Sequence, residues 1–294
     1  ENNVYASDYV AEEWVSYRDG VVPAAKSRTS VLPMVHTHWG QGAPYNNMCP
    51  TTTSGDGHCP VGCAATAMAQ VMKYWEWPKI GTGSHSYNSP VGGTQSVNFG
   101  NTTYDWDNMV DRATSSSTQA QQDAVALLSY HCGVSVDMGY GNNSSGAYPS
   151  DVINALKQYF DYSNGIGSAS RNYYSFDQWV GLLKSEINAG RPVLYSGWDN
   201  AGGGHGFVCD GYDNNDYFHF NWGWNGSCDG YYAIGYLSPG QGGTGAGSGC
   251  YNENNYILTG VQPNNASVAT PSNVTASVNM RDVTLSWDAV SGAA

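Results

Sequence analysis

The periodicity of the sequence changes from helical to extended near Gly190, and this change restricts the possible folds more than any other feature. Before it, apolar residues recur at helical spacing, which predicts helices at 7–19, 64–75, 118–132, 150–160 and 175–189. After it, short aromatic runs bounded by Gly, Asn and Asp predict antiparallel strands at 192–196, 205–212, 216–222, 230–234 and 255–261. A helical lobe followed by an antiparallel β lobe is α+β architecture, and ligand sites commonly form in the cleft between such halves.

The charge of the chain disfavours several classes of partner. The 294 residues carry a formal net charge of −13, which repels phosphate backbones and anionic lipid, so we expect no nucleic-acid binding. Because no apolar stretch approaches the roughly 20 residues that span a bilayer, we expect no membrane insertion. The sequence starts at Glu1, and we therefore expect an export signal to have been removed and the protein to be secreted or held at the cell surface.

Seven cysteines lie at positions 49, 59, 63, 132, 209, 228 and 250. Cys49 and Cys59 flank a polar loop, and Cys228 and Cys250 flank a Gly-rich segment, so a disulfide bond could close each loop. The cysteines at 132 and 209 lie in apolar runs, where two buried thiols or a third bridge fit equally well. No second close-spaced Cys or His pair completes four zinc ligands, so we expect no metal and no other cofactor.

Cys63 directly precedes the predicted helix 64–75, where the positive end of the helix favours thiolate over thiol. An unperturbed thiol has a pKa of about 8.5, whereas pairing with an imidazolium at such a site can lower the pKa to about 3 to 4. The helix end alone cannot supply that change, so we expect a histidine partner from the β lobe. Of the seven histidines, His205 fits best because it follows three glycines, which permit close approach of another chain segment, and opens an apolar strand.

Three separated motifs carry a family resemblance: residues 62–74 around Cys63, the Gly-Gly-His-Gly-Phe-Val run at 203–208, and Asn-Trp-Gly-Trp at 221–224. Together they resemble the streptopain family of secreted bacterial cysteine peptidases. Residues 39–46, 133–138 and 229–232 are also similar, and the resemblance covers about residues 33–262 in the same order. It implies a papain-like two-lobed fold, an active site in the cleft, and cysteine endopeptidase activity on protein or peptide substrates.

The resemblance also implies roles for individual residues. Cys63 is expected to be the nucleophile, and His205 the general base and acid. Trp222 and Asn221, from the Asn-Trp-Gly-Trp segment, are the candidates for orienting the imidazole ring.

An oxyanion donor is harder to assign, because papain-like enzymes place a Gln several residues before the nucleophile and this chain has Asp56 and Gly57 in that neighbourhood. A carboxylate there would repel the oxyanion. Gln41 is the only glutamine upstream of Cys63, so we expect Gln41 to deliver the side-chain amide from further back, beside the Cys63 backbone N–H. Residues 135–148 and the Gly-rich stretch 240–249 are expected to shape the specificity.

The chain is expected to divide into four parts, of which the resemblance implies the first two. Residues 1–32 are expected to be the remnant of a zymogen propeptide, with activation cuts near 26–30, and residues 33–262 the peptidase domain. Residues 263–270 are a predicted linker. Residues 271–294 are similar to the opening strands of a fibronectin type III module, truncated here, so we expect further C-terminal modules in the full-length protein.

Two other functions stay open from the sequence. A papain-like fold could carry out another acyl-transfer reaction, such as that of a transglutaminase or an amidase. The fibronectin-like segment would instead suit a secreted adhesion or binding protein with a degenerate peptidase body, although the presence of both Cys63 and His205 argues against that reading.

Overall fold

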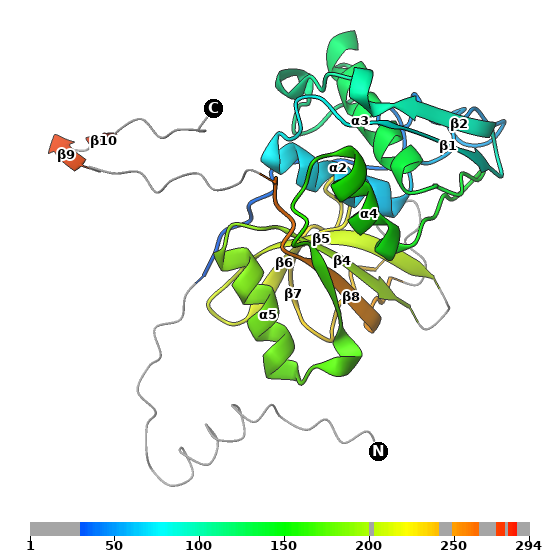
Figure 1. Ribbon diagram of the computed structural model, residues 1–294. Coiled ribbons are helices and arrows are strands. Elements are labelled where there is room, and N and C mark those ends of the chain that lie inside the picture. Colours follow the sequence, from blue (N-terminus) through cyan, green and yellow to red (C-terminus); the bar gives the residue numbers. More distant parts are fainter. Residues whose placement is uncertain (1–29, 200–202, 241–248, 265–274, 280–281, 287–294) are drawn as a thin grey trace, which may run out of the picture.

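The computed structural model describes residues 30–199, 203–240 and 249–264, together with the backbone of 275–279 and 282–286 (Figure 1). Its helices are α2 (Cys63–Trp75), α3 (Gln119–Ser135), α4 (Pro149–Tyr159) and α5 (Phe176–Asn188). Its strands are β1 (Ser84–Ser89), β2 (Gly93–Asn98), β3 (Gly167–Ser170), β4 (Val193–Trp198), β5 (Gly204–Tyr212), β6 (Tyr217–Asn221), β7 (Gly230–Ala233), β8 (Glu253–Thr259), β9 (Thr275–Asn279) and β10 (Asp282–Ser286). The predicted helix 7–19 lies outside the described residues.

Helix α2 is the central element of the helical lobe and contacts α3 and α4 on one side and β5 on the other. Its residues from Ala64 to Met72 are all buried, as the apolar pattern predicts. The helix ends at Glu76, which adopts the left-handed conformation and donates its N–H to the carbonyls of Lys73 and Met72. Pro78 lies two residues further on and prevents the helix from continuing.

Capping explains why two helices begin at the predicted positions. Thr118 and Gln121 form a reciprocal capping box at the start of α3. Ser175 and Gln178 form the same arrangement at the start of α5, as predicted. Each box satisfies backbone N–H groups that have no partner within the helix, so the helix start is fixed by local hydrogen bonds.

The β lobe is a six-stranded antiparallel sheet with the strand order β3-β8-β4-β5-β6-β7. Its five C-terminal strands are those that the sequence predicts. Strand β3 and the separate hairpin β1–β2 are absent from that prediction. The hairpin strands read Ser-His-Ser-Tyr-Asn-Ser and Gly-Thr-Gln-Ser-Val-Asn, which are mostly polar and mostly not β-branched, so they carry little of the usual strand signal.

Alternate residues of the central strands belong to two different hydrophobic cores. Leu194, Val208 and Leu258 project into the core that contains α2, α3 and α4. Their neighbours project into the second core, which α5 covers on the opposite face of the sheet (Figure 1). The sheet therefore separates two helical layers, and the α+β architecture predicted from the sequence is confirmed.

The described chain enters the β lobe before it reaches the helical lobe. Val31 pairs with Tyr212 at the end of β5, and the N–H of Val35 donates to a carboxylate oxygen of Asp210 at 2.7 Å. At the other end, β9 and β10 form an antiparallel pair, in the region where the sequence predicts the opening strands of a fibronectin-like module. The predicted propeptide cuts near 26–30 fall almost wholly outside the described residues.

The structure contains neither of the disulfide bonds that the sequence allows at Cys49–Cys59 and Cys228–Cys250. All seven cysteines are free thiols. The sulfur of Cys49 lies 3.9 Å from the Tyr140 hydroxyl. The sulfur of Cys250 accepts hydrogen bonds from Ser238 and Asn252. Spacing along the sequence brings cysteines to a common loop, but it does not determine where their side chains point.

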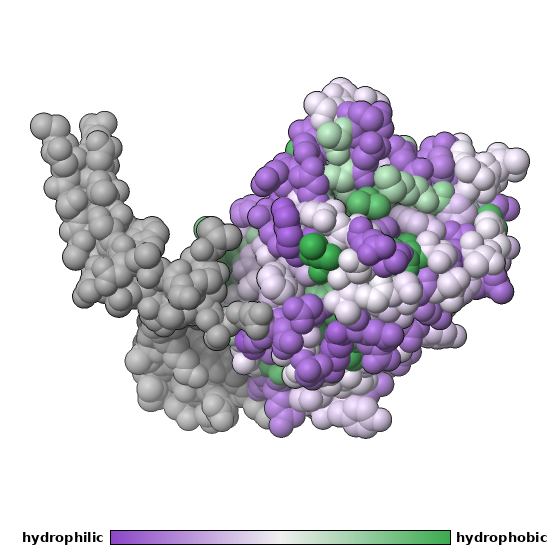
Figure 2. All heavy atoms as spheres, turned by 45° about the horizontal axis from the view of Figure 1, so that its top comes forward, coloured by the Kyte–Doolittle hydropathy of each residue, from purple (hydrophilic) through white to green (hydrophobic). Residues whose placement is uncertain are grey.

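No helix among the described residues is long and apolar enough to cross a membrane. On the face drawn in Figure 2, hydrophilic residues predominate and hydrophobic residues form small separate patches.

A buried histidine in α3 makes stability depend on pH. Burial lowers the pKa of His131 from 6.5 to about 4, and its Nδ1 lies 3.1 Å from the Tyr104 hydroxyl. Between these two values the unfolded chain binds a proton that the native protein does not, so the free energy of unfolding falls as the pH falls. The full change corresponds to about 3 kcal/mol.

We therefore expect His131→Gln, made in a Cys63→Ala background, to show a weaker loss of stability in urea unfolding between pH 7 and pH 4.5. His36→Gln, at an exposed histidine, is the matched control. Equal pH dependence in all three proteins would contradict the assignment of the effect to His131.

Candidate active site

Helix α2 begins at Cys63, so the thiol lies at the helix N-terminus as the sequence predicts. Gly62 caps the helix with φ 91°, a conformation that favours glycine. A Cβ atom on Gly62 would also come within 2.5 Å of the Met138 sulfur. The residue before the thiol is thus restricted both by its backbone conformation and by the space around it.

Strand β5 passes directly over the first turn of α2. A Cβ atom on Gly206 would lie 3.4 Å from Ala64 Cα and 3.5 Å from the Ala64 backbone nitrogen. Only a residue with little or no side chain allows the strand to lie this close to the helix. Because His205 precedes Gly206, this contact brings the histidine to the start of α2.

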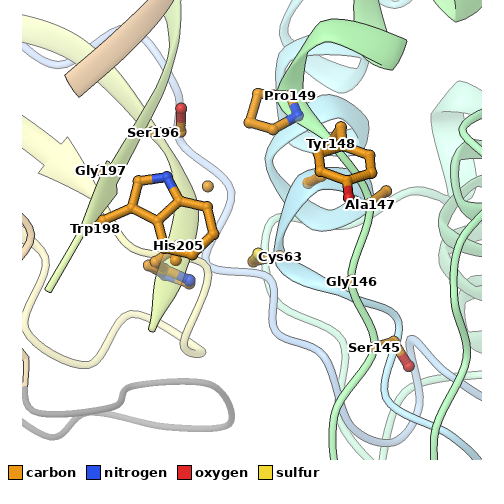
Figure 3. Close-up of a pocket in the computed structure, with 13 residues that line it drawn as sticks. Cys63, Ser145, Gly146, Ala147, Tyr148, Pro149, Ser196, Gly197, Trp198 and His205 are labelled. Atoms are coloured by element: carbon orange, nitrogen blue, oxygen red, sulfur yellow. The ribbon is translucent and has the colours of Figure 1, made fainter. Parts of the chain in front are cut away.

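Cys63 and His205 line one cavity of about 360 Å³ between the lobes (Figure 3). One wall comes from residues 145–149, which precede and begin α4, and the other from residues 196–198 and 204–206 of the sheet. The last four residues of the 135–148 segment line the cavity, and the contribution of this segment to the specificity stays a prediction. Of the Gly-rich stretch 240–249, which is also expected to shape the specificity, residues 241–248 lie outside the described residues.

The imidazole of His205 is held by a backbone carbonyl. Its Nε2 lies 2.8 Å from the carbonyl oxygen of Trp222. Because a carbonyl can only accept, Nε2 must carry the proton, and Nδ1 of the neutral ring is left with a free lone pair. That Nδ1 is buried and has no hydrogen-bond partner among the described residues. It is therefore the nitrogen available to receive a proton.

Aromatic rings surround the same imidazole. The Trp224 ring stacks on it at 4.8 Å between centroids, and the Trp222 ring is nearly parallel to it at 6.3 Å. Tyr251 packs from another side at 5.2 Å. These rings fix the plane of the imidazole, and ring faces attract a positive charge. Trp222 thus contacts His205 through its carbonyl oxygen as well as through its ring.

Burial opposes the predicted thiolate–imidazolium pair. It raises the pKa of the Cys63 thiol, although hydrogen bonds with the backbone of Gly206 and Ala64 act in the opposite direction. It also lowers the pKa of His205 to about 4, against the effect of the Trp222 carbonyl. Each group taken alone favours its neutral form, so only mutual attraction of the two charges can stabilise the ion pair. That ion pair stays a prediction.

Asn221 forms hydrogen bonds with backbone groups of Gly223 and Thr37 rather than with the His205 ring. Its Oδ1 accepts from the Gly223 N–H at 3.0 Å, and its Nδ2 donates to the Thr37 carbonyl at 2.6 Å. The peptide that follows Trp222 is therefore held on one side by Asn221, while its carbonyl holds His205. This arrangement suggests that Asn221 orients the ring through the backbone.

Gln41 lies beside the segment that leads to Cys63, because its carbonyl accepts the Val61 N–H at 2.9 Å. The residue is buried, and it is not among those that line the cavity. Asp56 is held elsewhere: its carboxylate accepts from the Ala43 N–H and from the Asn46 amide. Burial raises the pKa of Asp56, but these hydrogen bonds outweigh it and leave the pKa below its ordinary value.

Several residues at the site were not predicted individually from the sequence, although Tyr148 ends the predicted 135–148 segment. Tyr148 and Trp198 are large exposed aromatic residues on opposite walls of the cavity (Figure 3). Asp229 accepts the Trp222 N–H at 2.9 Å, and Gln70 donates to Asn221 at 3.0 Å. The sequence does single out Gln70, because it is a lone amide within a mostly apolar helix, seven positions after Cys63. In the part of the chain that is described, no group of three or more His, Cys, Asp or Glu residues could hold a metal ion.

A thiol on the helical lobe and a histidine on the sheet that line one cavity place the domain in the papain-like class of cysteine peptidase folds. The chain belongs to the Peptidase C10 family, whose model matches residues 39–232.

Solved structures support the same assignment. Interpain A, a cysteine protease of Prevotella intermedia, matches with a TM-score of 0.70 and 38% identity over 82% of this chain and 99% of its own. A fragment of prointerpain A from the same organism, carrying a cysteine-to-alanine mutation, matches with a TM-score of 0.67 and 34% identity, covering 89% of this chain and 86% of the fragment.

Two curated relatives are longer than the matched region. Streptopain of Streptococcus pyogenes is 33% identical over 80% of this chain and 62% of its own length. The thiol protease/hemagglutinin PrtT of Porphyromonas gingivalis is 32% identical over 82% of this chain, which spans only 29% of that protein. The chain therefore corresponds to part of each of these relatives.

The contact at Gly206 gives a direct test of the site geometry. We expect Gly206→Val to push β5 away from α2, because its methyl groups would overlap the Ala64 backbone. Alkylation of Cys63 by iodoacetamide, followed by mass spectrometry, should then slow at least tenfold. Gly206→Ala should be affected much less, since its Cβ would make ordinary contacts.

Gly230→Val is the matched control, because a Cβ on this strand glycine of the same sheet meets nothing within 4 Å. Equal alkylation rates in both valine variants would show that the β5–α2 contact does not govern the reactivity of Cys63.

Proposed function

We propose that this domain is a cysteine endopeptidase that hydrolyses peptide bonds through an acyl-enzyme intermediate. The observation that carries the proposal is that Cys63 and His205 line one cavity, while the Nδ1 of His205 has no hydrogen-bond partner among the described residues. Membership of the Peptidase C10 family supports it. Cys63 is the proposed nucleophile, and His205 the proposed general base and acid.

The reaction needs no group beyond the chain and water. The Cys63 sulfur attacks the peptide carbonyl while its proton passes to Nδ1 of His205. The same proton then protonates the departing amine, which leaves a thioester. Water, deprotonated by His205, attacks the thioester, and the thiol and a free carboxylate are released.

Supporting roles follow from the contacts around this pair. The Trp222 carbonyl keeps the Nε2 proton in place, which leaves Nδ1 facing the reaction, and Asn221 holds the peptide that bears this carbonyl. The oxyanion would be stabilised by the Cys63 N–H and by the Gln41 side-chain amide. The hydrogen bond from the Val61 N–H to the Gln41 carbonyl holds the Gln41 backbone beside the segment that leads to Cys63.

The substrate is a protein or peptide. The exposed aromatic residues on the cavity walls, Tyr148 and Trp198, suit apolar side chains of such a substrate. The net charge of −13 disfavours nucleic acid as a substrate or partner.

Regulation and location complete the proposal. Residues 1–32 are the remnant of a propeptide, as the similarity to the prointerpain A fragment suggests, and the enzyme is secreted or held at the cell surface. Residues 263–270 link the peptidase domain at 33–262 to a fibronectin-like module that starts at 271. The larger size of PrtT supports the presence of further C-terminal modules.

The activity is tested by digestion of casein. We expect the unchanged protein to cleave casein, and Cys63→Ala and His205→Ala each to lower the rate at least a thousandfold. Cys250→Ser, which removes a thiol outside the cavity, should retain activity, and iodoacetamide should abolish it. Crosslinking of casein without cleavage would indicate a transglutaminase instead, and binding without any reaction would indicate a degenerate adhesion protein.

Self-processing is tested on the same protein. We expect incubation of the active enzyme to remove the residues before about position 30, whereas the Cys63→Ala variant keeps them. N-terminal sequencing of both samples over time provides the measurement. Equal trimming of the two proteins would discard self-processing.

A further inference from the structure

Gln70 is a fully buried amide on α2, two helical turns after Cys63. A buried amide requires partners for both its oxygen and its nitrogen, since an unsatisfied group costs about 1–3 kcal/mol. Gln70 finds them on two segments far away in the sequence. Both of these segments lead directly to residues of the proposed active site.

The oxygen of Gln70 fixes the segment that carries Gln41. Oε1 accepts a hydrogen bond from the Trp39 N–H at 3.2 Å and one from the Thr37 hydroxyl at 3.0 Å. Trp39 lies two residues before Gln41. The candidate oxyanion donor is therefore tied to the same helix that bears the nucleophile.

The nitrogen of Gln70 fixes the anchor of the histidine. Nε2 donates to Asn221 Oδ1 at 3.0 Å, and the same oxygen accepts the Gly223 N–H. The peptide between Trp222 and Gly223 presents its carbonyl to His205 Nε2 at 2.8 Å. A continuous path of hydrogen bonds thus runs from Gln70 to the imidazole ring.

The direction of every bond in this network is determined. The Trp39 and Gly223 N–H groups can only donate and the Thr37 carbonyl can only accept, so neither amide can be flipped without placing like groups together. Gln70 must present its oxygen to Trp39 and its nitrogen to Asn221. A side chain that cannot donate would leave Asn221 without that bond.

We propose that Gln70 is a positioning residue that aligns both His205 and the Gln41 segment with the helix of Cys63. The proposal rests on the proposed peptidase function. One rigid helix would then set the relative positions of nucleophile, base and oxyanion donor, and Gln70 would act without touching the substrate.

The variant Gln70→Glu distinguishes the hydrogen bonds that Gln70 accepts, from Thr37 and Trp39, from the one that it donates to Asn221. A carboxylate still accepts from Thr37 and Trp39, but when ionised it cannot donate to Asn221 and instead faces the Asn221 oxygen. When protonated, it donates again. Because burial raises the pKa of a carboxyl group, this protonation should fall within an accessible pH range.

We therefore expect Gln70→Glu to lower kcat on a peptide substrate at least tenfold at pH 7.5, with KM changed less than threefold. The ratio of its kcat to that of the unchanged protein should rise at least fivefold between pH 7.5 and pH 5. Gln70→Met, which can neither donate nor accept through an amide, should lose kcat without this recovery.

Gln95→Glu is the matched control. Gln95 is also a buried amide of the helical lobe, but its hydrogen bonds go to Gly92, Gly93 and Tyr130, away from the site. A similar loss and recovery in Gln95→Glu would overturn the proposal, as would a ratio for Gln70→Glu that stays flat with pH. If neither Gln70 variant folds, as judged by thermal unfolding, Gln70 is needed for folding and the positioning role is rejected.

Alkylation of Cys63 by iodoacetamide distinguishes this proposal from the proposed function. Alignment of His205 affects the thiolate fraction whether or not a peptide is cleaved. The alkylation rate of Gln70→Glu, divided by that of the unchanged protein at the same pH, should therefore be at least fivefold lower at pH 7.5 and should recover toward pH 5. If the unchanged protein cleaves no peptide yet this pattern holds, the peptidase proposal fails and the positioning role stands. If peptides are cleaved and the alkylation rate is unaffected by Gln70→Glu, only the positioning role fails.

Discussion

The close contact between β5 and the first turn of α2 is the constraint on which the site depends. It joins elements from the two lobes, and it leaves room for little or no side chain at position 206. The histidine that precedes this glycine then lines the same cavity as the thiol that begins the helix. Each lobe supplies only one of the two residues. The proposed chemistry therefore depends on the packing between the lobes.

The surroundings of His205 combine two opposing requirements. Burial among Trp222, Trp224 and Tyr251 fixes the ring, but the same burial disfavours its charged form. The carbonyl of Trp222 resolves part of this conflict, because it selects one tautomer and stabilises the protonated ring. The charge state of the Cys63–His205 pair then depends on the mutual attraction of the two charges, which opposes the effect of burial.

Much of the fold could be predicted because its signals are local. Capping boxes, apolar periodicity and Gly-bounded aromatic runs place α3, α5 and the strands β4 to β8. The polar hairpin β1–β2 lacks such a signal. For the site, the sequence indicates residue types but not which atom acts: Trp222 contributes a backbone carbonyl to His205, and Asn221 holds the backbone rather than the ring. The cysteine pairings failed for the same reason, since side-chain direction depends on packing that spacing does not reveal.

The sharing of β4, β5 and β8 between two hydrophobic cores has a mechanical consequence. The core that contains α2 is built directly on these strands, so the lobes cannot swing apart about a hinge without breaking that core. The separation of the cleft walls at their base is therefore set before a ligand arrives. Different ligands would therefore be accommodated at the rims of the cleft, where Tyr148 and Trp198 are exposed. Such a preorganised cleft loses little conformational entropy when a ligand binds. In return, fewer ligand shapes fit the base of the cleft.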